Sequence, residues 1–175
     1  MKTWLRTSRS FDPAMIVADT SALISLASVG LLETVLAEYD VHTAGVVVSE
    51  LEETADYEDR HADAAATVLD HRDRVTSHEV DTEFTSSRVD RGEGDCALLT
   101  REIDAEFLVT DDLHALPELR NLSSARVAIS PILLRALVKR DRLEEREARE
   151  TLEELAARRD WLGGPIYRRA LELFE

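Results

Sequence analysis

The sequence has little of what disulfide-stabilised, zinc-binding or membrane proteins need. One cysteine, Cys96, in 175 residues excludes an intramolecular disulfide and a cysteine-rich zinc site, and it fits a reducing compartment. No run of 18 apolar residues is present, and no basic region followed by an apolar segment and a cleavage signature opens the chain. We therefore expect a soluble, cytoplasmic protein without a membrane segment.

Several catalytic and binding motifs are also missing. The five histidines lack the HxxxH spacing of zinc hydrolases and belong to no recognisable catalytic triad. Gly92-Glu93-Gly94 lacks the further glycine and the lysine of a phosphate-binding P-loop. The nine aromatic residues are scattered, so they form no platform on which bases could stack.

Positive charge is scarce, with 21 Lys and Arg against 36 Asp and Glu. The whole excess lies in residues 1–130, because residues 131–175 hold ten of each sign. An acidic chain normally argues against nucleic acid as a partner. However, only two of the cations are lysines, and this composition resembles the surface chemistry of halophile proteins. On that interpretation, the net charge of −15 reflects the solvent more than the substrate.

What the sequence does contain is an alternation of short apolar runs and helical periods. We expect strands at 16–18, 41–44, 75–80, 107–110 and 127–129, and helices at 22–36, 50 onward, 63–71, 96–103 and 113–119. Ser49 is the expected N-cap of the helix that begins at Glu50. This alternation predicts an α/β fold with a parallel sheet flanked by helices on both faces.

Both ends of the chain differ from this middle part. Residues 1–14 show no periodicity, and we expect a flexible tail or an upstream start codon there. Residues 15–130 form the expected α/β domain. Residues 131–175 read as a C-terminal helical extension, with helices at 132–138, 143–159 and 166–174, that packs on the domain.

Acidic residues stand where such a fold would gather them. Asp19 follows the apolar run Ile16-Val17-Ala18, and Asp111 and Asp112 follow Phe107-Leu108-Val109-Thr110. Glu50, Glu93 and Asp95 lie at or near expected helix starts. Strand ends and helix starts share one edge of a parallel sheet, so these carboxylates should converge there. Carboxylates gathered in this way would hold Mg²⁺ or Mn²⁺, which prefer oxygen ligands.

These stretches, in this order and spacing, resemble the PIN-domain ribonucleases over about residues 15 to 130. The matching segments are Ile16-Val17-Ala18-Asp19-Thr20-Ser21-Ala22-Leu23, Val46-Val47-Val48-Ser49-Glu50-Leu51, Gly92-Glu93-Gly94-Asp95-Cys96-Ala97-Leu98-Leu99 and Phe107-Leu108-Val109-Thr110-Asp111-Asp112. The resemblance implies a parallel sheet between helices and metal-dependent endonucleolytic cleavage of RNA. Some members of the family are toxins of toxin–antitoxin pairs, which implies an antitoxin as a partner.

The resemblance also implies the site residues. The expected catalytic acids are Asp19, Glu50, Glu93 and Asp111, and the expected metal ligands are these four with Asp95 and Asp112. Glu93 and Asp95 could both face a metal only if Glu93 preceded the helix. Asp111 ranks above Asp112 because it directly follows Thr110, and adjacent strand residues point to opposite faces. Thr20 or Ser21 could hold a carboxylate in place.

The number of metal ions stays open, as do the residues that bind the substrate. Arg91 and Arg101 are the first candidates for the substrate phosphate, with Arg120 and Arg126 behind them. The terminal helices could cover a partner or form a dimer seam. Two other functions compete with a ribonuclease, namely a binding module with an impaired site and a phosphohydrolase with an aspartyl nucleophile. The latter would favour a DxD pair, but Thr20 and Ser21 follow Asp19.

Overall fold

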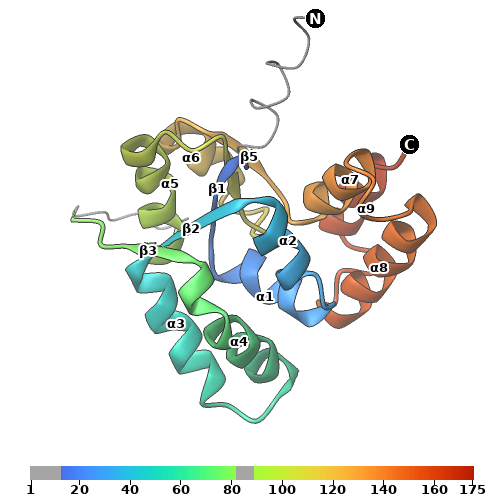
Figure 1. Cartoon of the computed structure of the whole chain (residues 1–175), viewed down its shortest axis with the longest axis horizontal. Coiled ribbons are helices and arrows are strands. Elements are labelled where there is room, and N and C mark those ends of the chain that lie inside the picture. Colours follow the sequence, from blue (N-terminus) through green and yellow to red (C-terminus); the bar gives the residue numbers. More distant parts are fainter. Residues whose placement is uncertain (1–12, 82–88) are drawn as a thin grey trace, which may run out of the picture.

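The short apolar runs of the sequence form one parallel β-sheet in the computed structural model, which describes residues 13–81 and 89–175 (Figure 1). In chain order the elements are β1 (Met15–Ala18), α1 (Thr20–Ser28), α2 (Leu32–Glu38), β2 (Asp40–Ala44), α3 (Gly45–Ala55), α4 (Arg60–Asp70), a 3₁₀ turn (Arg72–Arg74), β3 (Thr76–His78), α5 (Arg91–Ile103), β4 (Phe107–Val109), α6 (Leu116–Leu122), β5 (Arg126–Ala128), α7 (Pro131–Lys139), α8 (Glu145–Arg158) and α9 (Pro165–Glu172). The expected tail up to residue 12 and part of the expected loop at 86–92 lie outside the described residues.

The five strands have the order β3-β2-β1-β4-β5, and each pairs with its neighbour in parallel. Crossovers between parallel strands are right-handed almost without exception. The chain moves from β1 to β3 in one direction and from β3 to β5 in the other, so α1–α4 cover one face and α5–α6 cover the opposite face. This arrangement confirms the expected α/β class. It also brings the carboxyl ends of all five strands to the same edge, which we call the rim.

The expected helix over residues 22–36 is in fact two helices. α1 ends with Val29 as its C-cap, and Gly30 follows with φ of +72°. A positive φ costs glycine little because it has no Cβ. The apolar spacing continues across this turn, and for that reason periodicity alone predicted a single helix.

Two further helices, α3 and α5, begin five residues earlier than the sequence indicated. α3 begins at Gly45, so Ser49 is an interior residue and Glu50 lies in the second turn, away from the positive end of the helix dipole. α5 begins at Arg91, five residues before the expected start, because Asp90 caps it. The bond between the Glu93 backbone N–H and the Asp90 carboxylate is 2.8 Å long, and the Glu93 side chain accepts from the Asp90 backbone in return.

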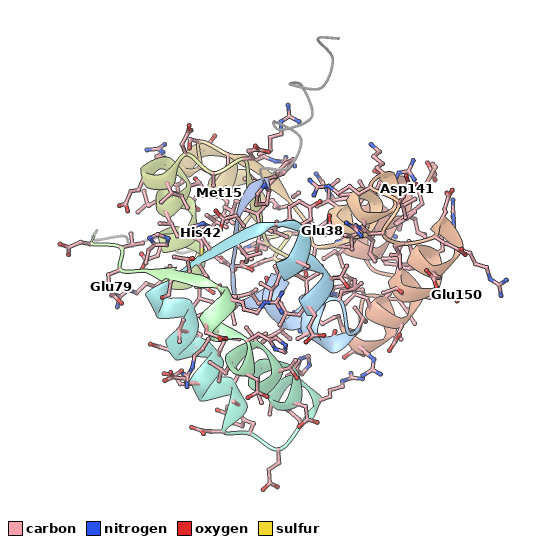
Figure 2. The ribbon with its side chains drawn as sticks, in the orientation of Figure 1. Met15, Glu38, His42, Glu79, Asp141 and Glu150 are labelled. Atoms are coloured by element: carbon pink, nitrogen blue, oxygen red, sulfur yellow. The ribbon has the colours of Figure 1, made fainter. Side chains whose placement is uncertain are left out.

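The last three helices share the hydrophobic core of the sheet. Leu134 and Leu137 of α7 and Leu152 and Leu155 of α8 are at most 1% exposed, in one cluster with the residues around the sheet. Glu38, at the end of α2, is labelled in Figure 2 where α2 faces the turn after α7. Its carboxylate lies 2.8 Å from the Arg142 guanidinium in that turn. Residues 131–175 therefore pack on the sheet-bearing part of the chain.

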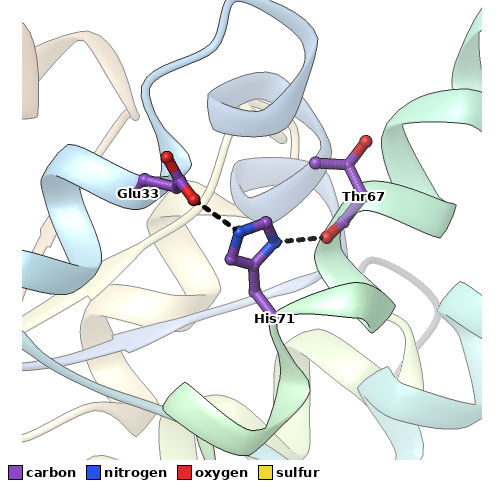
Figure 3. Close-up of polar contacts among 3 residues, drawn as sticks. All are labelled: Glu33, Thr67 and His71. Carbon is purple, nitrogen blue, oxygen red and sulfur yellow. Dashed lines mark hydrogen bonds and ion pairs between the residues drawn. The ribbon is translucent and has the colours of Figure 1, made fainter.

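A histidine joins two helices that cover the same face (Figure 3). His71, just after α4, donates from Nδ1 to the Thr67 carbonyl oxygen at 2.8 Å, and its Nε2 lies 3.1 Å from the Glu33 carboxylate of α2. Both ring nitrogens can donate only in the protonated imidazole. The two acceptors therefore raise the pKa of His71, with the Thr67 carbonyl as the larger cause.

Over residues 13–81 and 89–175, no single helix has both the length and the apolar character needed to cross a membrane. The pair α1 and α2 meets these criteria only together, with a bend of 116° between the two helices.

Candidate active site

Asp19 occupies the junction between β1 and α1. Its carboxylate caps α1 by accepting from the backbone N–H of Ala22 at 3.0 Å and from the Ser21 hydroxyl at 2.8 Å. Its own backbone N–H donates to the Val109 carbonyl, at 3.2 Å, at the end of the neighbouring strand β4. The side chain is buried at the rim, and burial raises the pKa of Asp19 to about 7.

The two aspartates after β4 have different surroundings. The Asp111 carboxylate accepts from the backbone N–H of Ser130 at 2.6 Å and from the Ser130 hydroxyl at 2.7 Å, so it is bound to the residue that precedes α7. Asp112 lies on the other side, near Glu93, and accepts from the backbone N–H of His114 at 2.9 Å. The two side chains point in different directions, as expected for adjacent residues. Asp111, which the sequence favoured as the metal ligand, is the one that Ser130 binds.

Glu93 and Asp95 on α5 also diverge. Glu93 faces Asp112, and burial together with this neighbouring carboxyl group raises the pKa of Glu93 well above its usual range. Asp95 lies 3.8 Å from Arg91, and its buried Oδ1 atom has no hydrogen-bond partner among the described residues. Because Glu93 lies inside the helix, the condition under which both residues could face one ion is not met.

Glu50 reaches the rim from the second turn of α3. The Thr20 hydroxyl donates to its carboxylate across 30 residues of sequence. A Cβ atom at Gly92 would come within 2.6 Å of the Glu50 carboxylate, so the glycine allows this side chain to pass over the start of α5. Burial raises the pKa of Glu50, and the Thr20 bond opposes that shift.

These side chains border one cavity at the rim. Its lining consists of Asp19, Thr20, Ser21, Ile24, Glu50, Asp90, Glu93 and Arg159. Four of the eight are carboxylates, and the one cation among them is contributed by the C-cap residue of α8. In the part of the chain that the structure describes, no three His, Cys, Asp or Glu side chains are close enough together to hold a metal ion.

The donor set nevertheless fits a hard divalent ion. All the acids at the rim offer oxygen, and no histidine is among the described residues that line the cavity. The raised pKa values of Asp19, Glu50 and Glu93 show that ionised carboxylates are poorly solvated there. A divalent cation would remove this penalty, so small shifts of these side chains toward a shared ion would be favourable.

The arginines expected to bind substrate lie in different places. Arg91 begins α5 beside Asp95, at the rim end of that helix. Arg101 is ten residues further along α5, or about 15 Å at the helical rise, and it donates to the Asn121 carbonyl at 3.4 Å. Arg120 lies near the end of α6 and Arg126 begins β5, at the edge of the sheet opposite the rim.

Three residues of the site were missed in the sequence. Asp90 carries a readable signal, because Asp followed three residues later by Glu is a capping box. Ser130 before Pro131 has the sequence of a helix N-cap, but its hydroxyl binds Asp111 instead. Arg159 has no local signal, since its partners are about 100 residues away in the sequence.

Comparison with known proteins identifies the family. No curated protein matches the chain. The model of the DUF3368 family, described as a PIN domain, matches residues 15–175, which include the sheet, the rim and the last three helices. The nuclease-like fold, with acids at the carboxyl ends of its strands, agrees with that match. The chain belongs to the PIN-domain family.

Proposed function

We propose that this protein is a metal-dependent endoribonuclease that hydrolyses RNA phosphodiester bonds. The observation that carries the proposal is the convergence of acids from four segments at one rim. Acids from the end of β1 and from α3 and α5 line the cavity, and the acids at the end of β4 interact with Asp19 and Glu93. Carboxylates are usually spread over a surface, because their mutual repulsion and desolvation destabilise a cluster. A buried cluster of this kind is expected at a functional site.

We assign Asp19, Glu50 and Glu93, which line the cavity, as ligands of Mg²⁺ or Mn²⁺, with Asp112 as the fourth acid beside Glu93. When bound, the ion would activate water and bind phosphate oxygens. The protein holds the carboxylates in position. Ser21 orients Asp19 and Thr20 orients Glu50, through the hydroxyl bonds described above.

The test is cleavage of RNA by the purified protein with Mg²⁺ or Mn²⁺, over a range of salt concentrations because of the halophile-like composition. We expect the wild type to cleave and Asp19→Asn to lose cleavage by at least about a hundredfold, since one ligand is removed. Circular dichroism should show that the variant remains folded. Mn²⁺ should raise the Tm of the wild type and leave that of Asp19→Asn unchanged.

Two results would contradict this function. Cleavage that persists in Asp19→Asn would point to a contaminating nuclease or to a different site. Mn²⁺ binding by a folded wild type that cleaves no RNA at any salt concentration would favour a binding module instead.

Membership of the PIN-domain family also leads us to propose a toxin role, with an antitoxin as protein partner. Expression of the wild type in a host should then arrest growth, and expression of Asp19→Asn should not. Equal growth of both strains would contradict this role without affecting the cleavage test.

A further inference from the structure

A second cavity adjoins the acid rim, and it is lined by cations. Arg60 and His61 of α4 and Arg158 and Arg159 at the end of α8 border it, and Asp63 is the one carboxylate among the described residues of its lining. We call this feature the cationic groove. The chain has a net charge of −15, but three guanidinium groups surround this cavity and make its local electrostatic potential positive.

Arg159 belongs to both cavities. It lines the rim cavity with Asp19 and Glu50, and it lines the cationic groove with Arg60 and His61. A ligand in the groove therefore lies next to the reacting centre. A single strand that crosses the rim would place a neighbouring phosphate in the groove.

The contacts of Arg159 leave part of its guanidinium available. One terminal nitrogen lies 3.2 Å from Nδ1 of His61, which must accept because an arginine only donates. Its buried Nε atom has no hydrogen-bond partner among the described residues. Burial lowers the pKa of Arg159, while the charges of Asp111 and Asp19 oppose that shift. The side chain is thus a cation held near the acids, and its terminal N–H groups, rather than the enclosed Nε, are the donors for a ligand in the groove.

The other two arginines are weakly engaged. Arg60 pairs with Asp160 at 3.6 Å and Arg158 pairs with Glu154 at 2.9 Å, and all four side chains are about half exposed or more. Exposed pairs of this kind contribute about 0–1 kcal/mol, so a phosphate could replace either carboxylate at little cost.

We propose that the cationic groove binds the phosphodiester of the RNA strand next to the one positioned at the acid rim. This inference rests on the proposed ribonuclease function and names the surface that holds its substrate. It also explains how a chain with little positive charge can bind RNA, because a few arginines near the rim then hold the substrate and no extended basic face is needed.

The experiment measures binding of a labelled single-stranded RNA by fluorescence anisotropy in the Asp19→Asn protein, which should not cleave it. Into this protein we would introduce Arg60→Gln and Arg158→Gln. The matched control is Arg146→Gln. Arg146 also lies on α8 and pairs with a glutamate four residues away, Glu150, and Arg158 likewise pairs with Glu154. All three substitutions remove one exposed charge.

Each groove variant should bind RNA about three- to tenfold more weakly. The slope of log affinity against log salt should also fall by about 0.7, the value for one lost phosphate contact on a single strand. The control should change neither quantity. In the wild-type background, Arg158→Gln should raise KM and leave kcat nearly unchanged.

The outcomes separate this inference from the proposed function. Equal RNA affinity and salt slope in groove and control variants would overturn the inference while cleavage by the wild type stood. RNA binding that depends on the groove, with no cleavage by the wild type, would support the inference and contradict the ribonuclease. Failure of the Asp19→Asn protein to bind RNA at all would overturn the inference.

Discussion

The two adjacent aspartates after β4 have different expected roles, Asp111 in the stability of the fold and Asp112 in RNA cleavage, and substitutions can test each role separately. Asp111→Ala removes both bonds from Ser130 and leaves a buried N–H and hydroxyl unpaired, at a cost of about 1–3 kcal/mol for each group. Chemical denaturation should show this loss of stability. Asp112→Asn removes a carboxylate beside Glu93, so we expect it to abolish RNA cleavage with little change in stability.

Ser130→Ala provides the control for this pair. It removes one of the two bonds to Asp111 and should cost about 1 kcal/mol, less than Asp111→Ala, with cleavage retained. If Asp111→Ala were fully stable but inactive, and Asp112→Asn remained active, the roles of the two residues would be reversed.

Some residues of the candidate site carry a local signal in the sequence, and others carry none. Asp19 could be found because it directly follows an apolar strand and opens a helix, two local signals at one position. The separate orientations of Asp111 and Asp112 depend on Ser130, which reaches the rim only when β5 pairs with β4. Arg159 meets the rim through packing of α8 beside α1, and no local pattern encodes such a contact.

At the scale of helices, His71 should make the attachment of α4 to α2 depend on pH. Its pKa is raised in the folded state, so the protonated ring stabilises the fold. This stabilisation is fully present below the ordinary histidine pKa of about 6.5 and is lost as pH rises through the higher folded value. His71→Ala should therefore lower Tm more at acidic pH than at alkaline pH.

A second variant, Glu33→Gln, keeps the His71 ring and removes the charged group beside its Nε2. The Tm of this variant should also fall below that of the wild type more at acidic pH than at alkaline pH. A Tm difference for His71→Ala that stayed constant with pH, or that grew as pH rose, would show that Glu33 and Thr67 do not favour the protonated ring.

The sequence predicted which segments are helices and which are strands better than it predicted where each helix begins and ends. Two glycines show why. Gly30 interrupts an apolar pattern that continues on both sides of it, so the break depends on one positive φ angle and not on periodicity. Gly45 begins α3 without a side-chain cap, after Ala44. Ser49, a better cap by residue type, lies inside the helix because the chain leaves β2 directly into α3.

For the whole molecule, removal of residues 131–175 should prevent stable folding. The truncated chain would lose four fully buried leucines of α7 and α8. It would also lose α7, which follows Ser130 directly. A buried leucine contributes about 2–5 kcal/mol, and total stability is usually about 5–15 kcal/mol. Fragment 15–130 should therefore be insoluble or lack a cooperative melting transition.

The full-length protein, measured under the same salt conditions, is the reference for this truncation. A soluble fragment that melted cooperatively and bound Mn²⁺ would show that the last three helices are a separable appendage.

Because Arg159 is the C-cap of α8, control over catalysis need not involve the acids. A protein that bound α8 and shifted this helix slightly would move Arg159 away from the rim cavity. The carboxylates of the rim would stay in place. If the proposed function holds, such an inhibitor would raise KM for RNA and leave the carboxylates free to bind the metal ion. The residues of α8 that bind this inhibitor are then free to change without any change in the acids of the rim.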